Sequence, residues 1–191
     1  DFVKTRFAFR DGYYRTGDLY SSYFSMRCTG TNISVKIRAA KDGYFAIGVD
    51  ARGRYSDGAY LKAGEEYTLK TNTSNAGSGV QIWVYGADKL EMLDISNATP
   101  SPSSWDISEL KLLKEFIIGG ANYTASNNNE GYLSTLNLGA MPFLETLDIR
   151  NTNVTSVDAQ QCPRLKSILA AGSQLQRANI ATNSKVATLQ F

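Results

Sequence analysis

The sequence predicts a mainly β protein, with an amino-terminal antiparallel β-sandwich followed by a short solenoid of about 21-residue coils. Three observations lead to this prediction. An apolar-x-x-apolar-x-apolar phrase recurs in the carboxyl-terminal half, short alternating apolar runs separated by turn residues fill the amino-terminal half, and no useful length of chain has a helical period. We place the sandwich in residues 1–88 and the solenoid in residues 89–191.

The repeat is clearest at the carboxyl end, where the apolar positions Leu147, Ile168 and Leu189 follow one another at intervals of 21 residues. Because a single coil of this length cannot bury its apolar face alone, a fixed period predicts coils stacked on one another. We expect about four and a half coils. Five copies of the phrase are present, beginning at Leu90, Leu113, Leu144, Leu165 and Val186.

Each coil also has a second apolar segment, eight residues before the next phrase. The phrase and this segment predict two parallel walls, with side chains alternating between the interior and the outside of each wall. The longest interval, 31 residues between Leu113 and Leu144, indicates an inserted loop near residues 123–131, which are rich in Asn and Ser. The second segments are Trp105–Ile107, Leu136–Leu138, Val157–Ala159 and Ala178–Ile180.

These phrases resemble leucine-rich repeats, and their Leu-Asp-Ile-x-Asn-Thr texture is similar to the repeats of bacterial surface proteins and of proteins encoded by gut bacteria and their phages. The resemblance implies a recognition face on the outward third and fifth positions of the phrase. A plain solvated sheet is the alternative. The residues that we assign to this candidate binding face are Met92, Asp94, Glu115, Ile117, Thr146, Asp148, Ser167 and Leu169.

In the amino-terminal half, Ile33, Val35 and Ile37 alternate with polar residues, as in a strand with one buried face. Further short strands separated by Gly, Asn and Asp predict two antiparallel sheets. Residues 1–18 are rich in aromatic residues and Arg, and we interpret them as an arm that lies on the sandwich or on another subunit. Because no linker follows residue 86, we expect the sandwich to cap the first coil.

Two further sets of residues are candidates for binding. Trp83 and Tyr85 face away from the apolar side of their strand, and form an aromatic platform unless the arm or the first coil covers them. Acceptor side chains also occur at one matching position in the second segments. Hydrogen bonding to one another and to the backbone is the favoured role of these residues, and Ca²⁺ binding is the alternative. They are Asp106, Asn137, Asp158 and Asn179.

Several classes of function find little support in the sequence. The chain has no histidine, no glycine-rich phosphate loop and no dinucleotide fingerprint, so we predict no catalytic residues, no metal site and no cofactor. The net charge of +2 is small and the Lys and Arg residues are scattered, which argues against nucleic acid. No apolar run is long enough for membrane insertion. Cys28 and Cys162 fall at inward positions in what we expect to be two different cores, too far apart for a disulfide, and we expect both to be buried free thiols.

The function that we predict is a non-catalytic recognition or adhesion module, exported to a bacterial cell surface, that binds a protein or a glycan through the repeat face. The alternative is a structural component of a virion or another multi-subunit assembly. In that case self-association would use the amino-terminal arm or the open terminal coil, because the last phrase ends at Phe191 with no polar capping segment.

Overall fold

β-strands make up nearly all of the regular structure, because β-branched and aromatic residues alternate with polar ones along the chain. The computed structural model describes residues 22–28, 31–49, 55–73, 79–98, 100–120, 134–182 and 185–190. The predicted arm at residues 1–18 and the predicted loop at 123–131 lie outside these described residues. No helix of the described chain is long and apolar enough to cross a membrane.

The described residues of the amino-terminal part form six strands and one short 3₁₀ helix. Their bounds are β1 (Tyr23–Cys28), β2 (Asn32–Ala39), β3 (Gly43–Gly48), β4 (Asp57–Leu61), β5 (Glu66–Asn72), β6 (Val80–Tyr85) and η1 (Ala87–Lys89). The strands form two facing antiparallel layers, with β4, β3, β6 and β1 in one and β2 and β5 in the other. The predicted β-sandwich is confirmed.

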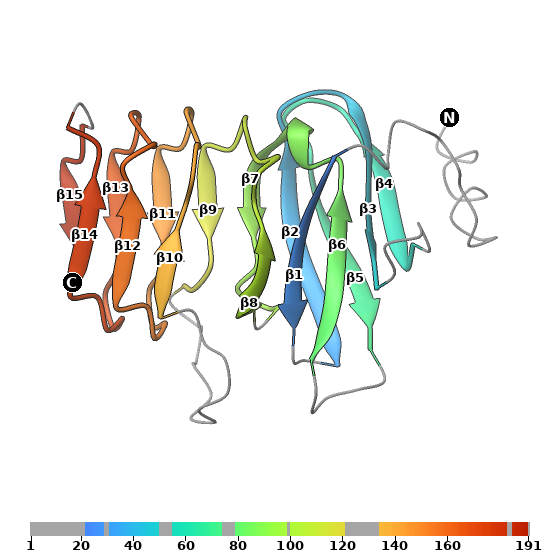
Figure 1. Ribbon diagram of the computed structural model, residues 1–191. Helices are drawn as coiled ribbons and strands as arrows, with labels where there is room; N and C mark the ends of the chain where they lie inside the picture. Colours follow the sequence, from blue (N-terminus) through green and yellow to red (C-terminus); the bar gives the residue numbers. More distant parts are fainter. Residues whose placement is uncertain are drawn as a thin grey trace.

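The carboxyl-terminal part is a parallel β-solenoid (Figure 1). One wall consists of β7 (Leu90–Asp94), β9 (Glu115–Ile117), β11 (Thr146–Asp148), β13 (Ser167–Leu169) and β15 (Thr188–Gln190). Leu147 is paired in register with Ile168, and Ile168 with Leu189, which confirms the 21-residue period. The opposite wall consists of β10 (Thr135–Asn137), β12 (Ser156–Ala159) and β14 (Arg177–Ile180).

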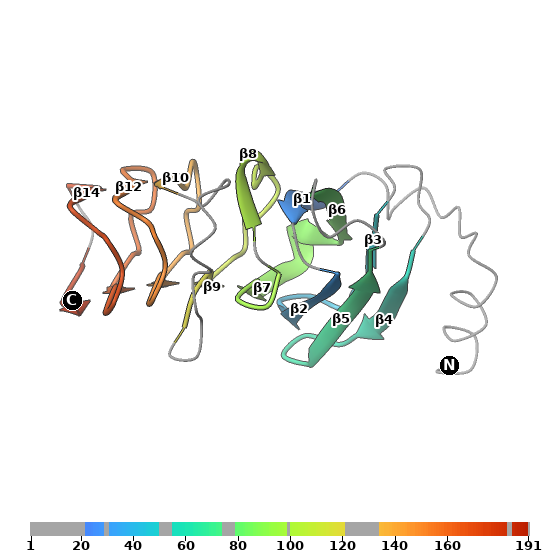
Figure 2. The same ribbon diagram turned by 90° about the horizontal axis from the view of Figure 1, so that it is seen from below.

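The sandwich and the solenoid share one sheet. β7 pairs in parallel with β9 on one side and antiparallel with β2 on the other, so seven strands continue in the order β15-β13-β11-β9-β7-β2-β5. Figure 2 shows this layer below a second layer that contains β8, β10, β12 and β14. One apolar core likewise runs from Leu69 in the sandwich to Ile168 in the solenoid. The sandwich therefore covers the first coil, as expected.

The first coil departs from the prediction in its second segment. β8 (Pro100–Asp106) pairs antiparallel with β1 and joins the five-stranded sheet of the sandwich. Asp106 consequently lies opposite Ser25, whereas Asn137 lies in register with Asp158. The reason is that β1 offers an open edge of hydrogen-bonding groups beside the first coil. The ring of Trp105 packs between Phe24 and Phe116, at centroid distances of 5.7 and 5.4 Å.

Backbone with positive φ recurs at the corners that follow β9, β11 and β13, at Gly120, Asn151 and Gly172. Asn151 has φ 58° and Gly172 has φ 72° at equivalent positions of adjacent coils. The Nδ2 of Asn151 donates to the carbonyl of Gly120, which occupies this position in the preceding coil, at 2.8 Å. A Cβ atom at Gly172 would overlap Oδ1 of Asn151. Gly172 therefore leaves room for the Asn151 side chain of the preceding coil.

Both cysteines are buried free thiols, as predicted. Burial raises the pKa of Cys28 to about 12 and that of Cys162 to about 11. Cys28 lies in β1 and Cys162 lies in the turn before β13. Both belong to one continuous core, and not to two different cores.

Candidate binding face

The outer face of the seven-stranded sheet is made of side chains that alternate with core residues such as Leu93, Phe116 and Leu147. The pairing register arranges these outward side chains in two rows that cross the strands. The first row consists of Glu66, Arg38, Met92, Glu115, Thr146, Ser167 and Thr188. The second consists of Thr68, Lys36, Asp94, Ile117, Asp148 and Leu169.

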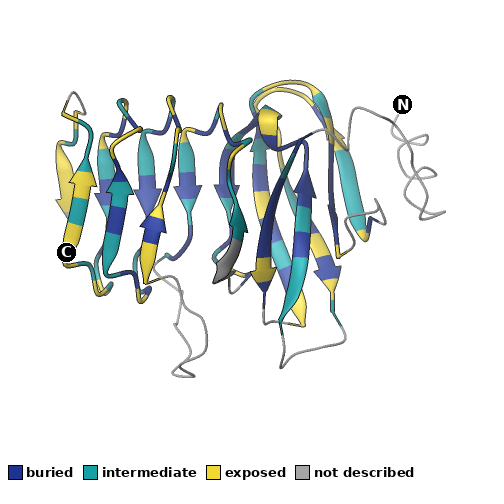
Figure 3. Cartoon of the chain, in the orientation of Figure 1, coloured by how far each residue is buried: buried dark blue, intermediate teal, exposed yellow. Residues whose placement is uncertain are grey.

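The structure therefore places all eight residues of the predicted face on one surface, and extends that surface onto β2 and β5. The sequence shows that Lys36 and Arg38 point out of their own strand. It does not show that this strand pairs with β7, because the pairing joins segments about 55 residues apart. Figure 3 shows how exposure increases along the stack, with β15 the most exposed strand of this sheet.

Two residues of the predicted face are much less accessible than expected. Met92 is only 2% exposed, although it points away from the continuous apolar cluster that contains Leu93. Its cross-strand neighbours Arg38 and Glu115 meet at 3.3 Å between Nη1 and Oε1, and their side chains cover the thioether. Met92 is a buried contact beneath an ion pair, and offers no surface for a ligand.

Asp148 is 3% exposed, because Arg150 folds back over it. The Arg150 Nη2 atom lies 2.6 Å from Oδ2, and its Nε lies 3.0 Å from Oδ1. The backbone N–H of Arg150 also donates to Oδ1 at 3.0 Å. The hydrogen bond to Asp148 raises the pKa of the Arg150 guanidinium. Asp148 therefore holds the strand end in place, and its carboxylate is not free to receive a ligand.

The same strand-end hydrogen bond recurs on both walls. The Oδ1 atoms of Asp94, Asp106, Asn137 and Asp158 each accept the N–H of the residue two positions later, at 3.0 to 3.1 Å. These are Asx turns, in which a short side chain ends a strand. Asn179 accepts instead from the Nε2 of Gln160 at 3.2 Å. Of the two roles considered for this ladder, hydrogen bonding is the one that the geometry displays.

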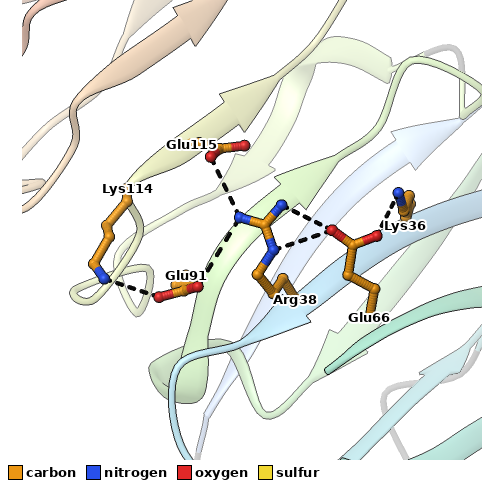
Figure 4. A network of polar contacts seen from close by, with 6 residues as sticks. All are labelled: Lys36, Arg38, Glu66, Glu91, Lys114 and Glu115. Carbon is orange, nitrogen blue, oxygen red and sulfur yellow. Dashed lines mark hydrogen bonds and ion pairs between the residues drawn. The ribbon is translucent and has the colours of Figure 1, made fainter. Parts of the chain in front are cut away.

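A charged network lies where the sandwich meets the solenoid (Figure 4). Arg38 contacts Glu66 at 2.8 Å and Glu115 at 3.3 Å, and lies 3.9 Å from Glu91. Glu91 reaches this face because it is an extra residue in β7, opposite the Arg38–Ala39 step of β2, where the register shifts. Lys36 and Arg38 lower the pKa of Glu66, and the hydrogen bond to Glu66 raises the pKa of Arg38.

The central part of the face combines apolar and hydroxyl side chains. Ile117 and Leu169 are half-buried on either side of Asp148, in the second row. Thr146 and Ser167 lie side by side in the first row, also half-buried. In contrast to the charged network at the sandwich end, this central part of the surface can offer hydrogen bonds and apolar contact to a ligand.

The aromatic pair predicted on β6 is largely covered. Tyr85 is 1% exposed and packs against Tyr55 and Tyr23, at centroid distances of 5.1 and 6.4 Å. Trp83 is half-buried against the same cluster. Tyr55 provides this cover, so Tyr85 offers no open platform. Among the described residues of this sheet, Tyr44 and Tyr60 form an exposed aromatic pair, which the alternation of apolar residues does not indicate.

No protein-family model, curated protein or solved structure matches the chain. Within the described residues, no three or more His, Cys, Asp or Glu side chains lie close enough together to hold a metal ion.

Proposed function

We propose that this chain is a non-catalytic recognition module that binds a protein or a glycan across the outer face of the seven-stranded sheet. The observation that carries the proposal is the continuity of that sheet, because the two rows of outward side chains extend over solenoid and sandwich alike. The face is thus larger than four coils alone would provide. We further propose that the coils are of the leucine-rich type and that the module acts at a bacterial cell surface.

The central patch is the part of the face that we expect to make the decisive contacts. Ile117, Leu169, Thr146 and Ser167 are partly exposed, and burying apolar area and satisfying hydroxyls both favour binding. The charged network at the sandwich end is already paired within the chain, and a ligand would have to replace those pairs. We therefore propose that the central patch provides most of the binding affinity, and that the charged network at the sandwich end fixes the orientation of the ligand.

The test compares the same substitution on the two walls. Ser167→Arg places a long charged side chain in the centre of the face, and Ser156→Arg places it on β12 of the opposite wall, where Ser156 is also half-buried. The chain is first screened against an immobilised panel of glycans and a displayed peptide library, and the Kd of the strongest hit is measured by interferometry. We expect Ser167→Arg to weaken that hit at least about tenfold, or about 1.4 kcal/mol, and Ser156→Arg to leave it unchanged.

Equal affinity for the two variants would exclude the face as the binding site, provided that both keep the wild-type melting temperature. The alternative function, a component of a virion or another assembly, depends on residues 1–18 and Phe191. These residues lie outside the described part of the chain, and that function stays a prediction.

A further inference from the structure

A further row of side chains lies along the edge where each coil turns into the large sheet, and it shares Glu91 and Lys114 with the charged network of the binding face. The turns before β9, β11 and β13 are equivalent, since the N–H groups of Leu113, Leu144 and Leu165 each donate to the carbonyl three residues earlier, at 3.1 to 3.4 Å. The residues just before these leucines, and the second residues of the phrases, therefore form two short columns. We call them together the turn edge: Leu112, Phe143 and Arg164 in one column, and Glu91, Lys114, Glu145 and Lys166 in the other.

The second column alternates in charge. Glu91 pairs with Lys114 at 2.9 Å, and Glu145 pairs with Lys166 at 2.7 Å. The backbone N–H of each of the last three residues donates to the carbonyl of the one before, at 2.8 Å, which holds the four positions about one strand spacing apart. The Lys114 and Lys166 side chains are 53% and 55% exposed, so each ammonium group can also donate a hydrogen bond to a second carboxylate.

The first column has an apolar centre. Leu112 and Phe143 are half-buried and occupy adjacent coils, and the guanidinium carbon of Arg164 lies 4.7 Å from the centroid of the Phe143 ring. Along the stacking direction, the midpoint of this apolar pair lies at the same level as the midpoint of the charged column, between the coils of β9 and β11.

We propose that the turn edge is the contact between two copies of this chain, which run antiparallel about a two-fold axis. This axis lies in the contact plane and is perpendicular to the direction in which the coils stack. It passes between the coils of β9 and β11. It places Lys114 against Glu145 of the second copy, Glu91 against its Lys166, and Leu112 against its Phe143. A contact of this kind uses the same patch twice, and an even alternating column is complementary to its own reverse.

One like-charge pair accompanies this arrangement, because the axis also relates Lys89 to Arg164. The Lys89 side chain lies against Gly43 of the sandwich and Arg164 lies on the Phe143 ring, so each already has a contact within its own chain. The turn edge as defined has seven residues, whereas each partner of a standard interface contributes roughly 20–30. We therefore expect a weak dimer, with a Kd on the order of 100 µM.

The test uses two variants that repel themselves and attract each other. The acidic variant, Lys114→Glu with Lys166→Glu, has four Glu in the column, and the basic variant, Glu91→Lys with Glu145→Lys, has four Lys. Sedimentation velocity at low salt and several hundred micromolar should show a dimer fraction for the wild type, monomers for each variant alone, and dimers again when the two are mixed. Circular dichroism establishes that both variants are folded.

A matched control changes the same charges elsewhere. Lys62→Glu with Lys70→Glu alters two exposed lysines of the sandwich and should keep the wild-type dimer fraction. Should a column variant fail to fold, Leu112→Ser removes the apolar centre with one substitution, and should weaken the dimer at least threefold. The proposal is overturned by a wild type that stays monomeric at these concentrations, by self-association of either variant at the wild-type level, by a monomeric mixture, or by an unchanged Leu112→Ser dimer.

Discussion

Single residues in this chain are constrained most where the backbone is left-handed. Gly172 has φ 72° and lies under the side chain of Asn151, whereas Gly64 has φ 86° and no atom near the position of a Cβ. Both glycines avoid the cost that a side chain pays in this backbone region. Only Gly172 also makes room for the neighbouring coil.

This difference gives a prediction with an internal control. Gly64→Ala should lower the free energy of unfolding by about 1–2 kcal/mol, the usual cost of left-handed backbone. Gly172→Ala should lower it by at least about 1 kcal/mol more, because the Asn151 side chain must move and the packing around it is disturbed. Urea denaturation of the two variants measures both values, and equal losses would show that the overlap with Asn151 is relieved at no cost.

At the scale of elements, the strand ends of the solenoid depend on short acceptor side chains, and these are not equivalent. Asp148 is buried and bonded to both the backbone and the guanidinium of Arg150. Asp158 occupies the corresponding strand end of the opposite wall, is half-exposed, and accepts the N–H of Gln160. Burial and charge both make the first set of hydrogen bonds the stronger one.

We therefore expect Asp148→Ala to cost about 2–3 kcal/mol of stability, since it leaves a partly buried N–H and a guanidinium without their acceptor. Asp158→Ala should cost about 0.5–1.5 kcal/mol, since water can replace a half-exposed acceptor. Chemical denaturation of the two variants gives the comparison. If Asp148→Ala proves as mild as Asp158→Ala, the role that we assign to Asp148 in holding the strand end is wrong.

At the scale of the whole molecule, the shared sheet and the continuous core predict that sandwich and solenoid unfold together. Leu93 lies at the junction, fully buried between Ile37 of the sandwich and Phe116 of the solenoid. Leu93→Ala should cost about 2–5 kcal/mol through lost burial and the cavity left behind. Because the two parts share this contact, the loss of stability should be equal in the sandwich and in the solenoid.

Hydrogen exchange under mild denaturant tests this directly. The amide protection of β5 and β11 should fall by the same amount in Leu93→Ala. A loss confined to β11 would show that residues 1–88 form a domain that is stable by itself, as the boundary suggested by the sequence allows.

Much of the architecture follows from the sequence, because the 21-residue period and the alternation of apolar residues are local patterns that fix which side chains enter the core. They correctly place Leu147, Ile168 and Leu189 in one column. The pairing register brings the eight residues of the candidate face into two adjacent rows, in which Met92 and Asp148 are buried. The resemblance to leucine-rich repeats and the function inferred from it rest on these patterns alone.

Only the tertiary structure decides which strands become neighbours and what covers the outward side chains. The pairing of β2 with β7, the transfer of Asp106 to the sandwich sheet, and the burial of Met92, Asp148 and Tyr85 each depend on residues far away in the chain or on a flexible side chain such as Arg150. A periodic pattern determines the direction of a side chain relative to its own strand. Accessibility depends on the neighbouring strands and loops, which that pattern does not identify.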